Sequence, residues 1–315
     1  MNWKTWLIHH GRQLGTLAGL LALGLALTLS SPYFLTVSNL LTVLEQVSIN
    51  AIVAVGMTVV IITAGIDLSV GSILALSGVV MATVLQQQLP VPIALLVGLG
   101  VGVACGMVNG LLITLGRLPP FIATLGMMSV ARGGALLFTE GRPVSGFSDG
   151  FRALAGSQVW VIPMPTVIML GVYVLAHFLL TRTRFGLYAY AMGGNEQATH
   201  LSGINVRLNK TLVYGLSGLT SAIAAVILTA RLNSAQPTAG MTYELDAIAA
   251  TVIGGASLMG GQGTLVGTLI GALLMGVLRN GLNLLEVSSF LQQVIIGGVI
   301  IVAVLVDMAL KTDKK

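Results

Sequence analysis

The sequence is poor in charged residues, which make up only 8% of its 315 positions, whereas apolar residues make up 55%. Soluble domains carry about 25% charged residues, because their surfaces must be hydrated. A chain with so little charge has most of its outer surface in lipid. The composition therefore excludes an ordinary soluble enzyme or binding domain and indicates a membrane protein.

Cysteine is almost absent too, since Cys105 is the only one. With one cysteine, no disulfide can form within the chain, and the fold must depend on helix packing. Cys105 lies inside an apolar run. Aromatic residues are also scarce, at 5%, whereas there are 40 glycines. Small residues let helix backbones approach closely in a membrane.

The sequence also lacks motifs of catalysis and metal binding. It contains no Gly-Lys dipeptide and hence no GxxxxGK[ST] phosphate-binding loop. It has no HExxH or CxxC motif, and its four histidines do not form a pattern of metal ligands. We therefore expect no catalysis by this chain, no metal site and no cofactor bound to it.

What the sequence does have is apolar runs long enough to cross a bilayer as helices, for which ~20 residues suffice. They predict an all-α polytopic membrane protein with about ten spans, in one transmembrane domain covering residues 1–315. Several spans are short, which indicates broken or tilted helices. The predicted spans are Leu14–Leu29, Thr42–Ile62, Val70–Leu85, Ile93–Leu115, Phe121–Phe138, Thr166–Leu180, Leu212–Ala230, Asp246–Met259, Leu265–Leu282 and Phe290–Val306.

The first span could be mistaken for a signal peptide, but bulky Tyr33 and Phe34 follow it and no small-x-small cleavage site is evident. Basic residues are concentrated in the segments that lie on the side of both termini. Positive charge marks the cytoplasmic side, so we expect a multi-pass protein with both termini in the cytoplasm. The net charge of +5 is thus a topology signal and needs no nucleic-acid partner.

Two Gly- and Ser-rich segments, residues 64–72 and 253–264, interrupt the apolar pattern in related positions. Paired interruptions are typical of a transport pathway built from internal repeats. A plain turn is the alternative, because glycine is also the usual residue of tight turns. For the first segment we favour a functional role, since it contains Asp67, and for the second both interpretations stay open.

Asp67 is a carboxylate between two apolar spans, where a charge is costly and usually functional. Our preferred interpretation is a cap on the helix that starts near Ser69, and a gating role is the alternative. Arg132 lies deep in its span and is expected to pair with a carboxylate or to line a wet cavity, whereas Arg279 is expected to reach the outer surface. The candidates for a polar pathway or gate are Asn50, Thr58, Asp67, Ser69, Asn109, Thr124 and Asn280. Each neutral one could equally join two helices by a hydrogen bond.

Three loops offer contacts outside the membrane. Residues 139–163 and 231–245 are expected on the outer side, and their charges Arg142, Arg152, Arg231 and Glu244 could dock a soluble protein. The basic segment 181–210 is expected in the cytoplasm. Within it, Asn195 can cap a short helix from Glu196 to about Leu201, which Gly203 would end. That helix could rest on lipid headgroups, but we favour docking to a soluble motor domain.

Several long strings resemble the permease subunits of ribose-type ABC sugar importers. They are GIDLSVGS (residues 65–72), GRLPPFIATLGMMSVARG (116–133), GGNEQATHLSGINV (193–206), SAQPTAGMTYELDAIAATVIGG (234–255) and GTLVGTLIGALLMGVLRNGLNLL (263–285). The resemblance runs over nearly the whole chain. Pro119 and Pro120 depart from the expected pattern, at the start of the fifth span.

The resemblance implies a homodimer in the bacterial inner membrane. A separate ATPase subunit, which binds ATP and Mg, would dock on the cytoplasmic side, and a periplasmic sugar-binding protein on the other. It also implies that the family's coupling helix is formed by Asn195, Glu196, Gln197, Ala198, Thr199, His200, Leu201, Ser202, Gly203 and Ile204. The substrate would be a monosaccharide, foremost D-ribose. The alternatives are another pentose, a hexose or a related small solute, and, from another class, an ion-coupled secondary transporter.

Overall fold

The computed structural model describes residues 3–312, with side chains placed for residues 14–305. This part of the chain is almost entirely helical. Its helices are α1 (Trp3–Ser30), α2 (Val37–Ile62), α3 (Val70–Gln86), α4 (Val91–Thr114), α5 (Pro120–Thr139), α6 (Asp149–Gly156), α7 (Met164–Arg182), α8 (Arg184–Gly194), α9 (Glu196–Leu201), α10 (Val206–Leu232), α11 (Tyr243–Ile253), α12 (Leu265–Leu284) and α13 (Ser289–Thr312). Four short strands form two antiparallel pairs, β1 (Val144–Ser145) with β4 (Ser234–Ala235) and β2 (Gln158–Val159) with β3 (Ile162–Pro163).

Six of the described helices, α2, α4, α5, α7, α10 and α12, are long and apolar enough to cross a membrane. Parts of α1, α3 and α13 are shorter apolar helices. The predicted all-α polytopic membrane fold is therefore confirmed. Prolines start α5 without disturbing it, because Pro120 is its first residue, where a helix needs no N–H donor.

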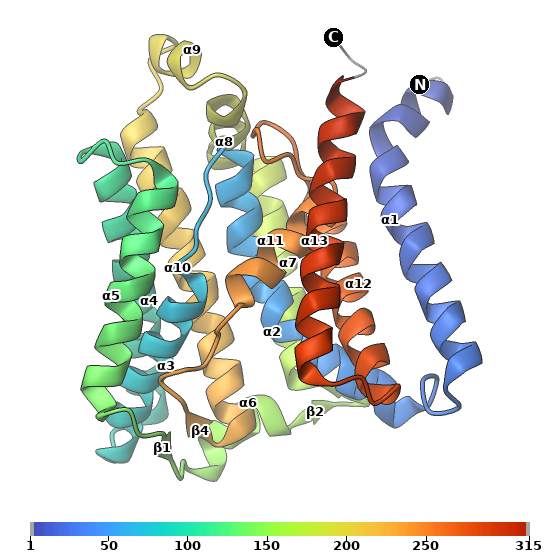
Figure 1. The fold of residues 1–315 in the computed structure, drawn as a ribbon. Coiled ribbons are helices and arrows are strands. Elements are labelled where there is room, and N and C mark those ends of the chain that lie inside the picture. The colour runs from blue at the N-terminus through green and yellow to red at the C-terminus, as the bar shows by residue number, and fades with distance from the viewer. Residues whose placement is uncertain (1–2, 313–315) are drawn as a thin grey trace.

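The helices run side by side between two ends of the molecule (Figure 1). One end carries α8, α9, the start of α1 and the end of α13, and we call it the α9 face. The opposite end carries α6 and the four strands, and we call it the α6 face. Each long helix therefore connects one face to the other, as a membrane-spanning bundle requires.

The core is built around α2 and α10. Helix α2 is apolar on all sides and its second half is buried throughout, as expected of a helix surrounded by others. Helix α4 packs against α10 along a row of glycines, Gly102, Gly106 and Gly110. A Cβ at Gly106 would meet the backbone of Tyr214 on α10. The small residues thus allow backbone contact between the two helices.

Two crossings are interrupted part-way. After α2, residues 63–69 turn back into the bundle from the α9 face, and α3 then runs on to the α6 face (Figure 1). After α10, residues 233–242 enter from the α6 face, and α11 then runs toward the α9 face. The start of α3 meets the segment 233–242 inside the bundle, because a Cβ at Gly71 would contact the carbonyl oxygen of Gly240.

This arrangement corrects the predicted pairing of interruptions. The segment that corresponds to residues 63–69 is 233–242, which the sequence analysis had assigned to an outer loop. Residues 253–264 form a turn at the α9 face, where the N–H of Gly261 donates to the carbonyl of Ile62 at 2.8 Å. The eighth span accordingly ends at Ile253 and not at Met259. Gly255, with a φ of +94°, breaks the helical conformation there.

Candidate translocation and coupling sites

Asp67 lies in the irregular segment before α3 and is fully buried. One carboxylate oxygen accepts hydrogen bonds from the backbone N–H of Ser69 at 2.9 Å and from its hydroxyl at 2.5 Å. The other accepts from the hydroxyl of Ser217 on α10 at 2.8 Å. Three donors thus satisfy a carboxylate that has no cationic partner at hydrogen-bonding distance among the described residues.

Other predicted pathway residues surround this carboxylate. Asn109 on α4 donates to the hydroxyl of Ser69 at 2.8 Å, and Thr124 on α5 donates to the carbonyl of Ile66 at 3.3 Å. The side-chain oxygen of Asn109 and the hydroxyl of Tyr214 are buried without a hydrogen-bond partner. The structure therefore brings Asp67, Ser69, Asn109 and Thr124 together around one interrupted crossing.

Asp67 makes the hydrogen bond of a helix cap, since its carboxylate accepts from the N–H of Ser69 directly before α3. The segment lies inside the bundle, however, and not at its surface. Asp67 also ties the irregular segment to α10 through Ser217. The sequence analysis missed Ser217 and Tyr214, because a serine or tyrosine in an apolar span has no distinctive spacing.

The remaining pathway candidates lie elsewhere. Thr58 is buried between α2, α11 and α12, and its hydroxyl lies 2.7 Å from that of Thr268. Asn280 and Asn39 exchange amide hydrogen bonds between α12 and α2. Asn50 donates to Asp246 on α11 at 3.3 Å. Whether any of these residues contacts a solute stays a prediction.

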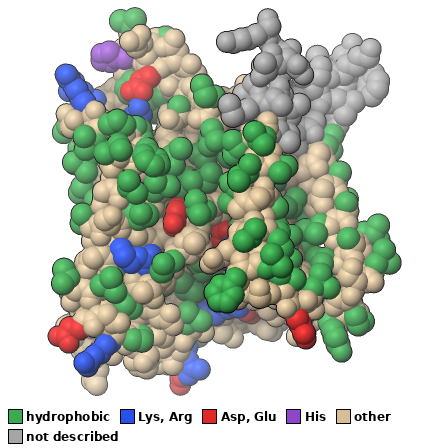
Figure 2. Space-filling model, in the orientation of Figure 1, with side chains coloured by type: hydrophobic (Ala, Val, Ile, Leu, Met, Phe, Trp, Pro, Cys, Tyr) green, Lys and Arg blue, Asp and Glu red, His purple; other side chains and the backbone are tan. Residues whose placement is uncertain are grey.

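Two charged side chains lie half-buried on the side of the bundle formed by α5, α11 and α13. Arg132 on α5 donates to the carbonyls of Pro237 and Ala239, both at 2.7 Å. Glu244, in the first turn of α11, lies close enough to attract it. Figure 2 shows acidic and basic side chains at mid-height on this side, among apolar ones. We call it the α5–α13 side.

Arg279 keeps 36% of its side chain exposed, but it also forms an ion pair that we did not expect. Its Nη2 donates to both carboxylate oxygens of Asp246, at 2.8 and 2.7 Å, and Asp246 is almost completely buried. The sequence analysis placed Asp246 at an outer span end and so missed its role. The reason is that α11 starts inside the bundle, which hydropathy alone does not reveal.

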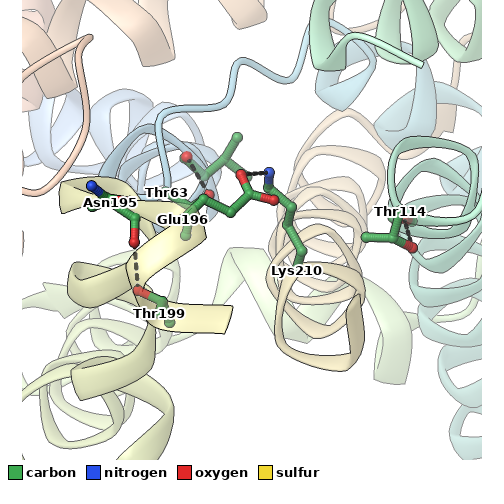
Figure 3. Close-up of polar contacts among 8 residues, drawn as sticks. Thr63, Thr114, Asn195, Glu196, Thr199 and Lys210 are labelled. Atoms are coloured by element: carbon green, nitrogen blue, oxygen red, sulfur yellow. Dashed lines mark hydrogen bonds and ion pairs between the residues drawn. The ribbon is translucent and has the colours of Figure 1, made fainter. Parts of the chain in front are cut away.

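The short helix predicted after Asn195 is confirmed. Helix α9 covers Glu196–Leu201, Asn195 caps it by accepting from the N–H of Ala198 at 2.9 Å, and Gly203 follows with a φ of +82°. Lys210 at the start of α10 donates to Glu196 at 2.6 Å, which fastens the base of α9 to a long helix (Figure 3). The opposite surface of α9 is free, since Leu201 is 86% exposed.

Helix α8 links α9 to the core. A Cβ at Gly193 would meet the carbonyl oxygen of Ile62 at the end of α2 and the N–H of Gly261. Tyr190 donates to the carbonyl of Gly263 at 2.7 Å, and burial raises the pKa of its phenol, which keeps it a neutral donor. A displacement of α8 would therefore be transmitted through these contacts to both α2 and the turn before α12.

The described structure has a cavity of about 400 Å³ and a groove of about 920 Å³. The groove lies at the α9 face. It is bordered by the end of α4, by α9 and by the start of α10. Arg117, His200 and Arg207 give it a basic rim, and Ile113 and Ile204 supply apolar contacts. A groove with these walls is suited to a soluble partner that carries acidic and apolar side chains.

The residues predicted to dock an outer partner do not form one cluster. Arg142 and Arg152 are exposed at the α6 face, and Arg152 lies 3.3 Å from Asp149. Arg231 faces Glu45 at 3.7 Å, and Glu244 lies half-buried on the α5–α13 side, beside Gly71. Among the described residues, no three His, Cys, Asp or Glu side chains lie together as metal ligands would.

These features define a class: a helical membrane protein with interrupted crossings inside and a groove at one end. The chain belongs to the family described as the permease component of the branched-chain amino acid transport system, whose model matches residues 39–304. The chain is 50% identical to the ribose import permease protein of Haemophilus influenzae, over 90% of this chain and 89% of that one. It is also 50% identical to the ribose import permease protein of Bacillus subtilis, over 94% of this chain and 92% of that one.

A more distant relative has another substrate in its name. The D-allose transport system permease protein of Escherichia coli K12 is 42% identical, over 89% of this chain and 86% of that one. No solved structure matches the chain.

Proposed function

We propose that this protein is the permease subunit of an ATP-driven importer for D-ribose. One observation carries the proposal: the 50% identity to ribose import permeases extends over 90% and 94% of the chain in two distant bacteria. Identity of this extent includes both interrupted crossings and α9. The relative named for D-allose, at 42% identity, makes another monosaccharide the alternative.

The groove at the α9 face is the proposed docking site for the ATPase subunit, which binds ATP and Mg. Helix α9 presents an exposed Leu201 beside the basic rim, and the Glu196–Lys210 pair holds its base. A partner seated there could push on α8, which contacts α2 through Gly193. The contacts thus provide a direct route from ATP hydrolysis to the interrupted crossings.

The α5–α13 side is the proposed contact with a second copy of the chain. Arg132 and Glu244 are half-buried on it, part-way between the two faces. Charges at such a depth do not face lipid in known membrane proteins, but a bundle interior or a water-filled path. A homodimer joined here would enclose both charges in a shared polar pathway for the sugar.

The α9 face is proposed to be cytoplasmic. Arg117, Arg182, Arg184 and Arg207 lie at the helix ends on that face, which satisfies the positive-inside rule. With α3 and α11 each completing one interrupted crossing, the chain would cross the inner membrane about ten times. The α6 face would then receive the periplasmic sugar-binding protein, and the two opposed interruptions would be an inverted repeat.

The test is uptake of labelled ribose into proteoliposomes that hold this chain, its ATPase subunit and a ribose-binding protein, with each omitted in turn. We expect ATP-dependent uptake only when all three are present. Uptake by this chain alone under an ion gradient would refute the proposal in favour of a secondary transporter. ATPase stimulation only by a binding protein loaded with another sugar would keep the class and change the substrate.

A further inference from the structure

A polar cavity of about 400 Å³ lies inside a single copy of the chain, apart from the groove at the α9 face. It is lined by α2, α10, α11, α12 and the start of α13. Its walls carry amide side chains, among them Gln46, Asn50, Asn283 and Gln292, and the charged side chains of Arg231, Asp246 and Arg279. It extends from the first turn of α11 to the start of α13, which lies toward the α6 face.

The cavity contains polar groups whose hydrogen-bonding capacity is not filled by other groups of the protein. The side-chain oxygen of Asn50 is buried and has no hydrogen-bond partner, although its amide nitrogen donates to Asp246. Buried polar atoms are normally paired, so an orphaned acceptor in a cavity points to a missing donor. Both contacts of Arg279 to Asp246 come from Nη2 alone, so its Nη1 and Nε are not required by that ion pair.

The chemistry and size of the cavity suit a polyhydroxylated solute. A hydroxyl group both donates and accepts, so it can satisfy the Asn50 oxygen and receive bonds from guanidinium and amide N–H groups. Ligand pockets begin at about 300 Å³, so a volume of about 400 Å³ fits a small ligand. Its floor is formed by the first turn of a helix that starts inside the bundle, where transporters commonly hold their substrates.

We propose that this cavity binds one pentose molecule within each copy of the permease, through Asn50 and the Asp246–Arg279 pair. The inference rests on the proposed function, since it names a site for the sugar that the importer carries. The cavity lies toward the α6 face, so the sugar contacts it before it enters the pathway shared by the two copies. Each dimer therefore has two equivalent pentose sites.

The test measures protection of a single cysteine by ribose. In a chain whose Cys105 is replaced by alanine, Met275→Cys places a thiol on the cavity wall without adding bulk. Ala153→Cys, on the exposed surface of α6, is the matched control. Each variant is reconstituted with the ATPase subunit and the binding protein, and the rate of labelling by a small methanethiosulfonate reagent is followed with ribose or with sucrose at equal osmolarity.

We expect ribose to slow the labelling of Met275→Cys several-fold, to leave Ala153→Cys unchanged, and to lose its effect when Asn50→Leu is added. Equal labelling rates with ribose and sucrose, in an importer that takes up ribose, would overturn the cavity site alone. Protection that persists with Asn50→Leu would overturn the role of Asn50. Absence of ribose uptake by the complex in which only Cys105 is replaced would instead contradict the proposed function.

Discussion

At the scale of single residues, the protein places polar groups in its interior and satisfies them locally. Asp67 is the clearest case, because Ser69 and Ser217 supply all of its donors. A buried acceptor that loses part of its hydrogen bonding costs about 1–3 kcal/mol. The interrupted segment before α3 therefore depends on this one carboxylate for its position.

Asp67→Asn should lower the stability of the protein, since an amide offers one oxygen where the carboxylate offers two. We expect a loss of about 1–3 kcal/mol, measured as a lower midpoint of thermal unfolding in detergent. Asp149→Asn is the control, because Asp149 is exposed on α6 and pairs only with Arg152. Equal midpoints for Asp67→Asn and the unmodified protein would show that the hydrogen bonds of Asp67 do not hold the segment.

A second residue-scale prediction concerns the contact between α8 and α2. Gly193→Ala should impair ribose uptake and stability, because its Cβ would collide with the backbone of Ile62. Overpacking of this kind costs about 1–3 kcal/mol. Gly194→Ala is the matched control, since a Cβ at Gly194 meets no atom within 4 Å. If the two variants behaved alike in uptake and unfolding, the close contact between α8 and α2 would not contribute to either property.

At the scale of elements, α9 shows which structural features can be predicted from a sequence. Its cap, length and end depend on neighbours in the chain, Asn195 and Gly203, so local rules predicted it correctly. The first turn of α11 could not be predicted in the same way. Asp246 and Arg279 are 33 residues apart, and only the folded bundle brings them together. Of the two opposed interruptions, the sequence indicated the first, at residues 64–72, and missed the second, because the Gly-rich turn 253–264 has the same composition and residues 233–242 resemble a loop.

The ion pair at the base of α9 leads to a charge-reversal experiment. Glu196→Lys should weaken the docking of the ATPase subunit and uncouple uptake, because it places two cations where α9 meets α10. Adding Lys210→Glu should restore much of the loss, since it recreates the pair in reverse. Co-purification of the ATPase subunit and ribose uptake are measured together. A double variant as defective as Glu196→Lys would mean that Glu196 acts on the partner and not on Lys210.

Gly203 gives a companion prediction for the same element. Gly203→Val should reduce uptake without preventing membrane insertion, because its φ of +82° is strained for any other residue. Gly150→Val is the control, since a Cβ at either glycine has open space and Gly150 has no positive φ. Normal uptake by Gly203→Val would show that uptake does not require a fixed turn after α9.

At the scale of the whole molecule, the direction of insertion can be read from the two ends. With Cys105 replaced by alanine, Ala198→Cys on α9 should react with an impermeant thiol reagent only after the inner membrane is opened. Ser148→Cys beside α6 should react in intact spheroplasts, where the outer surface is accessible. The reverse pattern would place α9 outside and would exclude its contact with a cytoplasmic ATPase.

The meeting of Gly71 with Gly240 limits how the bundle can move. No side chain separates the two backbones, so there is no flexible atom to absorb a displacement of one segment against the other. Because α3 leads from this contact to the α6 face and α11 to the α9 face, the two run in opposite directions from one shared point. In the proposed importer, a shift that widens the bundle toward one face would therefore narrow it toward the other. A single backbone contact would then oppose leakage, because both ends could not open at once.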